Sequence, residues 1–564
     1  MSWVLGVNYS HDRSACLIKD GKIVVAIEEE RLDRIKHSVG FLSVAEYNQL
    51  IKVTPMKAIN YCLETACISI DDVDIVVTNS ALQDNSSEIA KGEIPIKDKS
   101  KIKSISTPSH HMAHAYSTYF ASPFNESAIL VIDSYGSYND KYKTSVESES
   151  FYIAKGKNIE KINSNLFMYN LKSLSLGIFY NYFARKLKFT TPIGSDEISI
   201  FKNAYPEAGK LMGLSAYGEK RGDWEELIKK INGRIQVSYE NINNKYELWK
   251  MIDGISDSQV DYNEKFYKDI AYKAQEELES AILYLANELY KVTKQKKLCI
   301  AGGVGLNAVV NRRILDETPF EDIFILPAAN DAGIALGCAY YGYYNILGRE
   351  NRYAIENSYF GREYSNDEIL SSIEKYSNSV NYRSTSLKEV ASIISGGKVV
   401  GWFQGKSEFG PRALGHRSIL ADPRIPNMKD YLNEKVKFRE AFRPYAPSVL
   451  YEHAQEYFDI DCEYPYMVMV APVKEDKKQI IPAIVHADGT ARLQTVTKKT
   501  CEQYYNLINE FHKITGVPVL LNTSFNKQEP IIETPEDAIK TFLKTNIDFL
   551  VVGNYLIERI GRND

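Results

Sequence analysis

Short apolar runs separated by polar or glycine-rich loops dominate the first 340 residues. Apolar runs of about 4–8 residues bounded by turn residues are typical of buried strands. Three such strands are predicted to end in loops at 6–12, 133–136 and 302–303. Open α/β sheets bind ligands at the carboxyl ends of their strands. The pattern therefore predicts an α/β domain with a ligand site formed by these loops.

Local patterns predict several further elements of this domain. Segments 15–19 and 23–27 flank Asp20-Gly21, a pair typical of two-residue hairpin turns with positive φ. Residues 43–70 are predicted to be helical. Residues 266–297 carry apolar side chains at three- and four-residue spacing, which predicts an amphipathic helix used for packing.

The pattern loosens between 140 and 260, and a second unit is predicted further on. Residues 145–150 are predicted to form a polar turn before a strand at 151–154. The stretch 345–385 is polar, which favours a domain boundary near 350. A helix at 387–395 and a strand at 398–403 follow it. The chain is thus divided into domains 1–350 and 351–564.

Composition narrows the class of protein. The 564 residues carry a net charge of −5, with 68 basic and 73 acidic residues interspersed, which argues against a nucleic-acid or membrane surface. The seven cysteines include no Cys-x-x-Cys pair and are expected to be reduced. The N-terminus resembles no signal peptide, and no apolar run is long enough to span a membrane. We expect a cytoplasmic protein.

Histidines crowd into one segment, at positions 110, 111 and 114. On a helix, His110 and His114 lie one turn apart on the same face, so both rings can reach one metal ion. Asp133, at the end of a predicted strand, could supply a third ligand, and Asp331 also follows an apolar strand. The alternative is a His pair that merely lines or caps a helix.

The second domain contains a group of Arg and Lys residues among small residues. Guanidinium groups beside glycine-rich loops suit a compact, doubly charged anion such as phosphate. The alternative is a solvated basic face, but several of these arginines lie beside proline and apolar residues that tend to be ordered. The pattern favours an anion pocket built from this group: Arg412, Arg417, Lys435, Lys437, Arg439, Arg443 and Arg492, with Asn522 after a buried strand.

Several motifs together resemble one family, the NodU/CmcH/TobZ-type O-carbamoyltransferases. They occur in the family's order over nearly the whole chain, which makes the set far more specific than any one motif. They are HHMAHA (110–115), GGVGLN (302–307), DAGIALG (331–337), GPRALGHRSILADP (410–423), FRPYAPS (442–448), DGTARLQTV (488–496) and NTSFN (522–526).

The resemblance implies a fold and a chemistry. The N-terminal domain would have the duplicated ATPase fold of actin, sugar kinases and Hsp70 (Kae1-like), followed by a YrdC-like α/β domain. Carbamoyl phosphate and ATP would form a carbamoyl-adenylate, which carbamoylates a hydroxyl of a small, usually glycosidic or natural-product, acceptor. Joining carbamate to AMP neutralises its carboxylate and supplies a leaving group. The sequence leaves open whether the chain forms a homo-oligomer.

The resemblance also implies roles for individual residues. His11 would be the acceptor-side base, since an imidazole pKa near 6.5 suits proton transfer, although it could instead simply pair with Asp12. Lys36 would contact the adenylate. A divalent metal, Fe²⁺ in the best-known relatives, would be bound by His110, His114, Asp133 and Asp331. The nucleotide would be bound by Gly136, Gly302, Gly303 and Asn307. Carbamoyl phosphate would be bound by Arg412, Lys437, Arg443, Arg492 and Asn522.

Two departures from the family pattern are visible. The stretch 524–530 lacks a glycine and an arginine usual there, and Lys527 could substitute as a point charge. The region 181–210 fits the pattern poorly. Both bear on how the acceptor and the nucleotide are positioned.

Three other functions use related domains. A protein-modifying relative like the hydrogenase maturation carbamoyltransferase would carry Cys-x-x-Cys pairs, which this sequence lacks. A tRNA threonylcarbamoylation role conflicts with the negative net charge. A non-catalytic nucleotide-binding regulator is disfavoured by the intact set of metal-ligand candidates.

Overall fold

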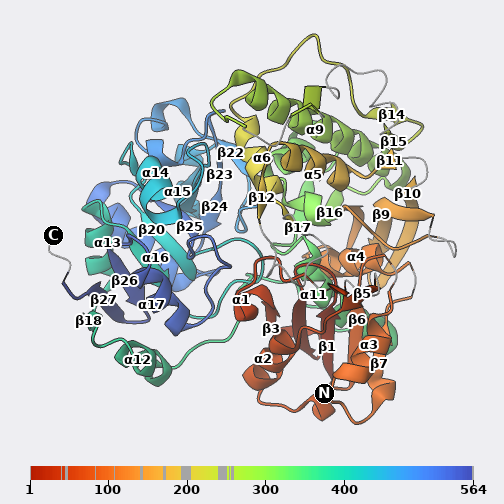
Figure 1. Ribbon diagram of the computed structural model, residues 1–564, viewed down its shortest axis with the longest axis horizontal. Helices are drawn as coiled ribbons and strands as arrows, with labels where there is room; N and C mark the ends of the chain where they lie inside the picture. The colour runs from red at the N-terminus through yellow and green to blue at the C-terminus, as the bar shows by residue number, and fades with distance from the viewer. Residues whose placement is uncertain are drawn as a thin grey trace. The chain divides into compact units, whose positions relative to one another are not determined.

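The structure is a computed structural model that divides into two compact units, Met1–Ile355 and Glu356–Asp564 (Figure 1). The sequence had suggested a boundary near residue 350. The residues that the structure describes are 2–39, 41–44, 49–82, 84–106, 108–139, 144–168, 173–191, 205–238, 251–252, 254–255 and 260–561.

The first unit contains two five-stranded sheets with the same topology. Their strand orders are β3-β2-β1-β6-β7 and β10-β9-β8-β16-β17. In each sheet three strands form an antiparallel meander, and two parallel strands extend the meander's first strand. This repetition is the duplicated ATPase fold expected from the sequence.

The strands of the two repeats correspond pairwise. The first sheet consists of β1 (Trp3–Asn8), β2 (Ser14–Lys19), β3 (Lys22–Glu28), β6 (Ile75–Asn79) and β7 (Ile102–Ser104). The second consists of β8 (Glu126–Ile132), β9 (Ser145–Lys155), β10 (Asn158–Met168), β16 (Lys297–Ala301) and β17 (Asp322–Ile325).

Each repeat closes with a helix that follows its last strand. Helix α4 (His110–Ala121) follows β7, and α11 (Ile334–Tyr341) follows β17 through the short helix η5 (Asp331–Gly333). The two helices pack together, and α11 also packs on β1 and β2. The amphipathic helix predicted at 266–297 is α9 (Lys265–Thr293), which packs on α5 (Leu176–Lys186), α6 (Ala208–Ser215) and α10 (Ala308–Glu317).

The hairpin prediction at Asp20-Gly21 is confirmed. β2 and β3 pair antiparallel across these two residues, whose φ values are +49° and +87°. The pair of positive values is the one that such tight hairpin turns require.

The helical prediction for 43–70 is wrong for its first half. Residues 41–52 contain two short paired strands, β4 (Phe41–Val44) and β5 (Gln49–Lys52), and helix α2 covers only Met56–Ala66. Pro55 stands directly before α2, and a proline disfavours helical backbone in the residue before it. An uninterrupted helix across Pro55 was therefore not available. A separate short helix, α1 (Glu30–Asp33), follows β3.

The polar turn predicted at 145–150 is also wrong, because these residues begin strand β9. Their polar side chains are buried rather than exposed: Glu147 and Ser150 are 0% exposed and Glu149 is 1% exposed. Polarity was read as a surface turn, whereas this strand carries buried hydrogen-bond and ion-pair partners. Residues 192–204, part of the region 181–210 that fits the family pattern poorly, lie outside the described residues.

The second unit is built on an eight-stranded mixed sheet with the order β18-β27-β26-β19-β20-β25-β21-β24. Neighbouring strands are antiparallel except β19 with β26 and β21 with β24. Its strands are β18 (Val380–Ser384), β27 (Tyr555–Arg559), β26 (Phe549–Val552), β19 (Val400–Phe403), β20 (Arg417–Ala421), β25 (Val519–Ser524), β21 (Ala446–Leu450) and β24 (Gln494–Val496).

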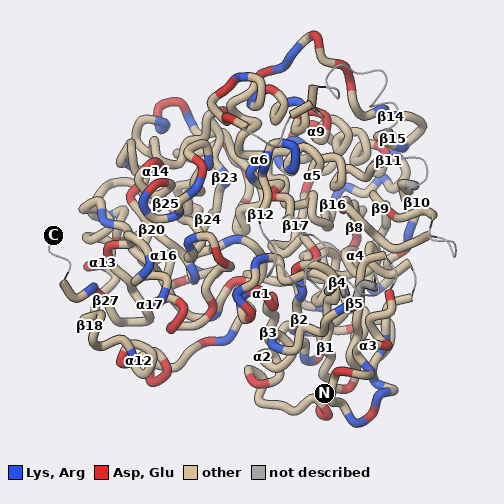
Figure 2. Tube along the Cα trace, in the orientation of Figure 1, with Lys and Arg blue, Asp and Glu red and all other residues tan. Residues whose placement is uncertain are grey.

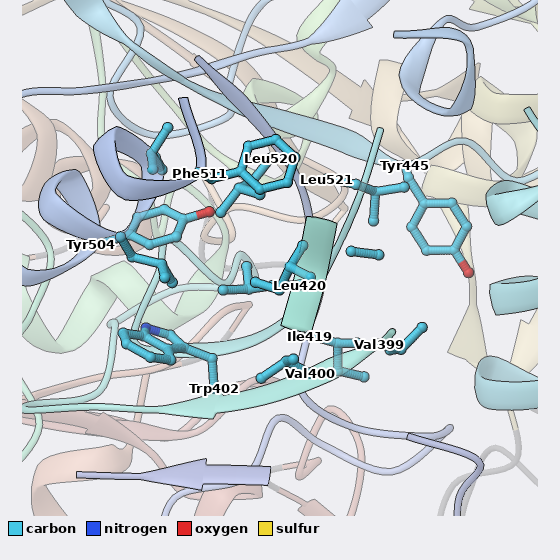
Figure 3. Close-up of a cluster of buried hydrophobic side chains, with 14 of the residues drawn as sticks. Val399, Val400, Trp402, Ile419, Leu420, Tyr445, Tyr504, Phe511, Leu520 and Leu521 are labelled. Carbon is cyan, nitrogen blue, oxygen red and sulfur yellow. The ribbon is translucent and has the colours of Figure 1, made fainter. Parts of the chain in front are cut away.

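Helices α13 (Leu387–Ser395) and α16 (Glu502–Thr515) pack against each other and on this sheet. Figure 3 shows part of the core, where the Trp402 and Tyr504 rings and Leu420 lie among apolar strand residues. The apolar positions of α16 face inward, and Leu507, Ile508 and Phe511 are fully buried. This core fixes the loops that carry the unit's arginines.

Two surface features bear on the remaining expectations. Within each unit, blue and red segments are interspersed along the trace in Figure 2, so no long stretch carries a single sign of charge. Absence of a nucleic-acid partner nevertheless stays a prediction. Among the described helices, none combines the length and the apolar character needed to cross a membrane.

Candidate functional site

The predicted metal ligands come from corresponding positions of the two repeats. His110 is the first residue of α4, after β7, and Asp331 opens η5, after the equivalent strand β17. Asp133 follows β8, whose counterpart β1 leads into His11 and Asp12. Because corresponding strands end at the same edge in each repeat, the duplication brings residues more than 200 positions apart to one site.

The four residues converge in a buried cluster. His110 Nε2 lies 3.3 Å from Asp133 Oδ2 and 3.6 Å from Asp331 Oδ1. His114 Nε2 lies 3.6 Å and 3.5 Å from the same two oxygens. One ligand atom from each residue falls within 4.8 Å of all the others, so the set could hold a metal ion.

The hydrogen bonding of the cluster fits a cation. His110 Nδ1 lies 3.1 Å from Asn79 Oδ1, which can only accept, so this nitrogen carries a proton, and in the neutral ring Nε2 presents a lone pair. Both ring nitrogens of His114 and Asp331 Oδ1 are buried without a hydrogen-bond partner. Lone pairs of two imidazoles and two carboxylates thus face one another, which is favourable only around protons or a metal.

The pKa shifts of His110 and Asp133 reflect the opposite charges gathered in the cluster. Burial alone would lower the pKa of His110, but the Asp331 and Asp133 carboxylates outweigh it and raise that pKa to about 10. Burial and the charge of Asp331 would raise the pKa of Asp133, yet the adjacent His110 and His114 rings hold it well below its usual range. Two negative and two potentially positive groups therefore stabilise one another in a buried setting.

Asn79 and Asp84 support His110 and were not identified from the sequence. Asn79 Nδ2 donates to Asp84 Oδ2 at 3.1 Å and to Ser109 Oγ at 2.8 Å, which fixes the amide so that its oxygen faces His110. Ser10 Oγ similarly donates to Asp331 Oδ2. Asn79 ends β6, and a polar residue at the end of a buried strand was the available signal.

His11 lies beside the cluster and pairs with Asp12, as the alternative interpretation expected. Its Nδ1 lies 2.9 Å from Asp12 Oδ2, and its Nε2 lies 3.5 Å from Asp331 Oδ2. The Tyr205 hydroxyl lies 3.2 Å from both ring nitrogens. Burial would lower the pKa of His11, but the charges of Asp331 and Asp12 raise it to about 9. The structure thus shows both the pairing and the proximity to the ligand cluster.

Lys36 is held by an ion pair rather than standing free. Its Nζ pairs with Glu207 Oε1, and His37 lies 3.9 Å from the same oxygen. His37 Nδ1 also lies 3.0 Å from Asp12 Oδ1, so Asp12 links His11 to His37. Asp12, Glu30 and His37 form a second group that could hold a metal, and sequence reasoning missed it.

The four nucleotide-binding candidates have different environments. A Cβ at Gly136 would lie 2.7 Å from His111 Nε2 and 2.6 Å from Glu147 Cβ, so close packing requires glycine there. Gly302 has φ +91°, and a Cβ on it would lie 2.1 Å from the Ile132 carbonyl oxygen.

The other two candidates are Gly303 and Asn307. The Gly303 N–H points to Asp133 Oδ1 at 3.4 Å, which places this glycine beside the ligand cluster. The Asn307 side chain accepts from the Val310 N–H at the start of α10 and pairs reciprocally with Gln275 at 3.0 Å. The Asn307 side-chain amide is therefore occupied by hydrogen bonds within the protein. Nucleotide binding by all four residues stays a prediction.

In the second unit, the predicted arginines form a like-charged group. Burial, followed by the charges of Arg412, Arg443 and Arg439, lowers the pKa of Arg492 well below its usual range. Burial and Arg443 lower the pKa of Arg412 to about 10. The Nε atoms of Arg412 and Arg492 and the Oδ1 of Asn522 are buried without hydrogen-bond partners. These groups are arranged to receive an anion with both acceptor and donor atoms.

The two halves of the chain each match a family description. Residues 3–91 and 81–340 match the model described as carbamoyltransferase N-terminus, and residues 391–559 match carbamoyltransferase C-terminus. The chain belongs to the carbamoyltransferase family. The family identified from the sequence motifs is thereby confirmed, and membership indicates a transferase.

Individual relatives agree with this family assignment. The carbamoyltransferase chain is 36% identical to nodulation protein NolNO of Sinorhizobium fredii over 98% of its own length and 79% of the relative. It is 35% identical to nodulation protein NolO of Bradyrhizobium diazoefficiens over 80% and 78% of the two chains. A solved structure of full-length HypF in its phosphate- and nucleotide-bound form matches 60% of this chain and 55% of HypF at 15% identity, with a TM-score of only 0.33.

Three other residues near the arginines of this carbamoyltransferase are held by contacts within the protein. Lys437 Nζ donates to the carbonyl oxygens of Ser524 and Asn526 at 2.7 and 2.8 Å, so it secures the 524–526 loop. Asn522 Nδ2 donates to Ser448 Oγ at 3.0 Å. Lys527, considered as a substitute for a missing arginine, lies with its Nζ 3.9 Å from the centre of the Phe438 ring.

Proposed function

We propose that this member of the carbamoyltransferase family is an O-carbamoyltransferase that uses carbamoyl phosphate and ATP. Its reaction would release phosphate from carbamoyl phosphate and join the resulting carbamate to AMP, with loss of pyrophosphate. The carbamoyl-adenylate would then pass its carbamoyl group to a hydroxyl of a small molecule and release AMP. The acceptor class, glycosidic or natural-product, rests on the family resemblance.

The observation that carries this proposal is the presence of two buried sites with opposite requirements. Within the described part of the chain, Arg412 and Arg492 have no acidic partner, and burial with the charge of neighbouring arginines lowers the pKa of both. Arg443 has one acidic neighbour, with its Nη1 3.7 Å from Glu440 Oε2. Such a site favours a compact dianion, and carbamoyl phosphate is one. Lys437 would support this site indirectly, by holding the 524–526 loop.

The site of the first unit suits transfer to an alcohol. His110, His114, Asp133 and Asp331 would hold a divalent metal, for which Fe²⁺ is the expectation from the family. A metal bound there would polarise a carbonyl and offset developing negative charge, a contribution of several kcal/mol. We assign the metal to these residues because one ligand atom from each lies within 4.8 Å of the others, and atoms of His114 and Asp331 are buried there without a partner.

His11 is the candidate base for the acceptor hydroxyl. Asp12 Oδ2 accepts from its Nδ1. The charge of Asp331 is the main cause that raises the pKa of His11 against burial, so a metal bound to Asp331 would favour the neutral ring, whose Nε2 lone pair lies on the side of Asp331. An imidazole so oriented can take a proton from a hydroxyl brought within hydrogen-bond distance. The Lys36–Glu207 pair would have to open or shift for Lys36 to contact an adenylate.

The proposal is tested by incubating the purified protein with ATP, carbamoyl phosphate and Fe²⁺, and measuring pyrophosphate. Release that requires all three, together with a gain of one carbamoyl mass on a hydroxylated sugar or antibiotic, is the expected result. Binding of ATP without turnover would instead support a nucleotide-binding regulator. Transfer to a protein thiol or to tRNA, with no small-molecule product, would show that the acceptor is a macromolecule and not a small hydroxylated compound.

A further inference from the structure

Cys501 and His416 form a close thiol–imidazole pair in the second unit, apart from the arginines proposed to bind carbamoyl phosphate. His416 Nε2 lies 3.1 Å from Cys501 Sγ. The two residues are distant in the sequence, since His416 lies on the loop before β20 and Cys501 is the residue before α16. Neither residue has a role in the proposed carbamoyl transfer.

The protonation of His416 follows from its second hydrogen bond. His416 Nδ1 lies 2.6 Å from the Lys406 carbonyl oxygen, which can only accept. Nδ1 therefore carries a proton, and in the neutral ring the Nε2 lone pair faces the thiol. A base that is fixed by a third group and aimed at a nucleophile is the arrangement that activates cysteine.

The surroundings hold this ring in place and favour its cationic form. The Tyr359 ring stacks on His416 with centroids 3.7 Å apart and an 11° interplanar angle. The Glu408 carboxylate, 1% exposed, accepts from the backbone N–H of His416 at 2.9 Å and has one oxygen without a partner. Tyr359 is itself fixed by its hydroxyl, which donates to the Leu414 carbonyl at 2.9 Å.

Cys501 also gains from its position on the helix. It is the N-cap of the 14-residue helix α16, where unpaired backbone N–H groups favour a negative charge. Burial would raise the pKa of this thiol, but His416 and these N–H groups lower it below its usual value. Burial raises the thiol pKa of Cys16, Cys62, Cys299 and Cys338 instead.

We propose that Cys501, with His416 as its paired base, is an activated thiol that reacts with small electrophiles, hydrogen peroxide among them. The residue is 7% exposed, which admits small reagents in preference to large ones. His416 lies on the same short loop as Arg412, four residues later in the chain. The thiol chemistry itself does not depend on the proposed transfer reaction.

The peroxide reaction balances with the groups present. The Cys501 thiolate attacks one peroxide oxygen, a sulfur–oxygen bond forms and the O–O bond breaks. The sulfur is oxidised by two electrons to sulfenic acid, and the peroxide is reduced. The departing hydroxide takes the proton from the His416 imidazolium and leaves as water.

The first test is the pH profile of iodoacetamide labelling on the full-length protein, with each cysteine quantified by peptide mass. The exposed Cys67 provides an internal reference. We expect the Cys501 rate to rise less steeply than the Cys67 rate from about pH 6.5 to 8.5, because an ordinary thiol gains about tenfold per pH unit below its pKa of about 8.5. A Cys501 rate that rises in parallel with Cys67, or no labelling of Cys501 in the folded protein, would overturn the proposal.

The second test removes the base. In His416→Asn, the Cys501 labelling rate at pH 6.5 should fall by about tenfold or more while the Cys67 rate stays unchanged, since tenfold corresponds to one unit of thiol pKa. Hydrogen peroxide should add one oxygen to Cys501 in the wild type, and the product should be trapped by dimedone. An unchanged Cys501 rate in a folded His416→Asn protein refutes the pairing. Should this variant not fold, the wild-type pH profile decides alone.

Discussion

The His–Asp cluster of the first unit and the arginine group of the second unit concentrate buried charge in opposite ways. The first combines two imidazoles with two carboxylates that stabilise one another at 3.3–3.6 Å. The second gathers arginines, and burial together with neighbouring arginine charge lowers the pKa of Arg412 and Arg492. A balanced cluster of lone pairs fits a cation, whereas an unbalanced cluster of donors fits an anion. We therefore propose a cation as the ligand of the His–Asp cluster and an anion as the ligand of the arginine group.

The largest effect is expected from removing a member of the balanced cluster. His114→Ala should lower carbamoyl transfer by at least about a hundredfold, because a catalytic metal contributes several kcal/mol and each 1.4 kcal/mol is about tenfold. Bound metal, measured by mass spectrometry of the purified protein, should fall in parallel. The partly exposed His453→Ala is the matched control.

Wild-type turnover by a folded His114→Ala protein would contradict the metal assignment. Loss of metal with full activity would separate the cluster from catalysis. Circular dichroism should show that the fold survives, since His114 makes no side-chain hydrogen bond that holds it to its neighbours.

The next effect tests the unbalanced cluster. Arg443→Ala should raise the KM for carbamoyl phosphate by about ten- to a hundredfold, because a hydrogen bond to a charged group contributes about 1.5–3 kcal/mol. ATP binding, measured by calorimetry, should not change. Arg383→Ala, which removes an exposed arginine paired with Glu389, is the control. An unchanged KM would count against the anion pocket.

The sequence predicted which four residues cluster in the first unit, but not the residues that orient them. His110 and His114 share a helix face by spacing alone, and Asp133 and Asp331 stand where apolar strands end. The groups that orient them come from elsewhere in the chain: Asn79 faces His110, and Ser10 donates to Asp331 across 321 positions. Such partners depend on tertiary folding, which no local pattern records.

The two errors in the fold have related causes. The helical prediction for 43–70 gave too little weight to Pro55, although the rule for the residue before proline was available. The polar stretch 145–150 was assigned to the surface because burial is normally associated with apolar residues. Glu147, Glu149 and Ser150 are buried because partners such as Lys161 and His111 satisfy them. Only the fold identifies those partners.

The smallest effect separates binding from stability within the arginine group. Arg492→Met keeps an unbranched, flexible side chain but removes a charge that burial and three arginines disfavour. Replacing a buried charge by an apolar side chain of similar volume is often stabilising. Without ligand, the melting temperature of this variant should rise by about 2–4 °C, which corresponds to about 1 kcal/mol for a unit of this size.

With phosphate bound, the wild type should have a higher melting temperature than Arg492→Met. An anion bound at a hundred times its Kd stabilises the folded state by about 2.7 kcal/mol, so saturating phosphate should raise the wild-type melting temperature and leave Arg492→Met nearly unchanged. His114→Ala should respond to phosphate as the wild type does, because its change lies in the other cluster. If Arg492→Met is less stable without ligand and still gains from phosphate, Arg492 is a structural residue and the anion lies elsewhere.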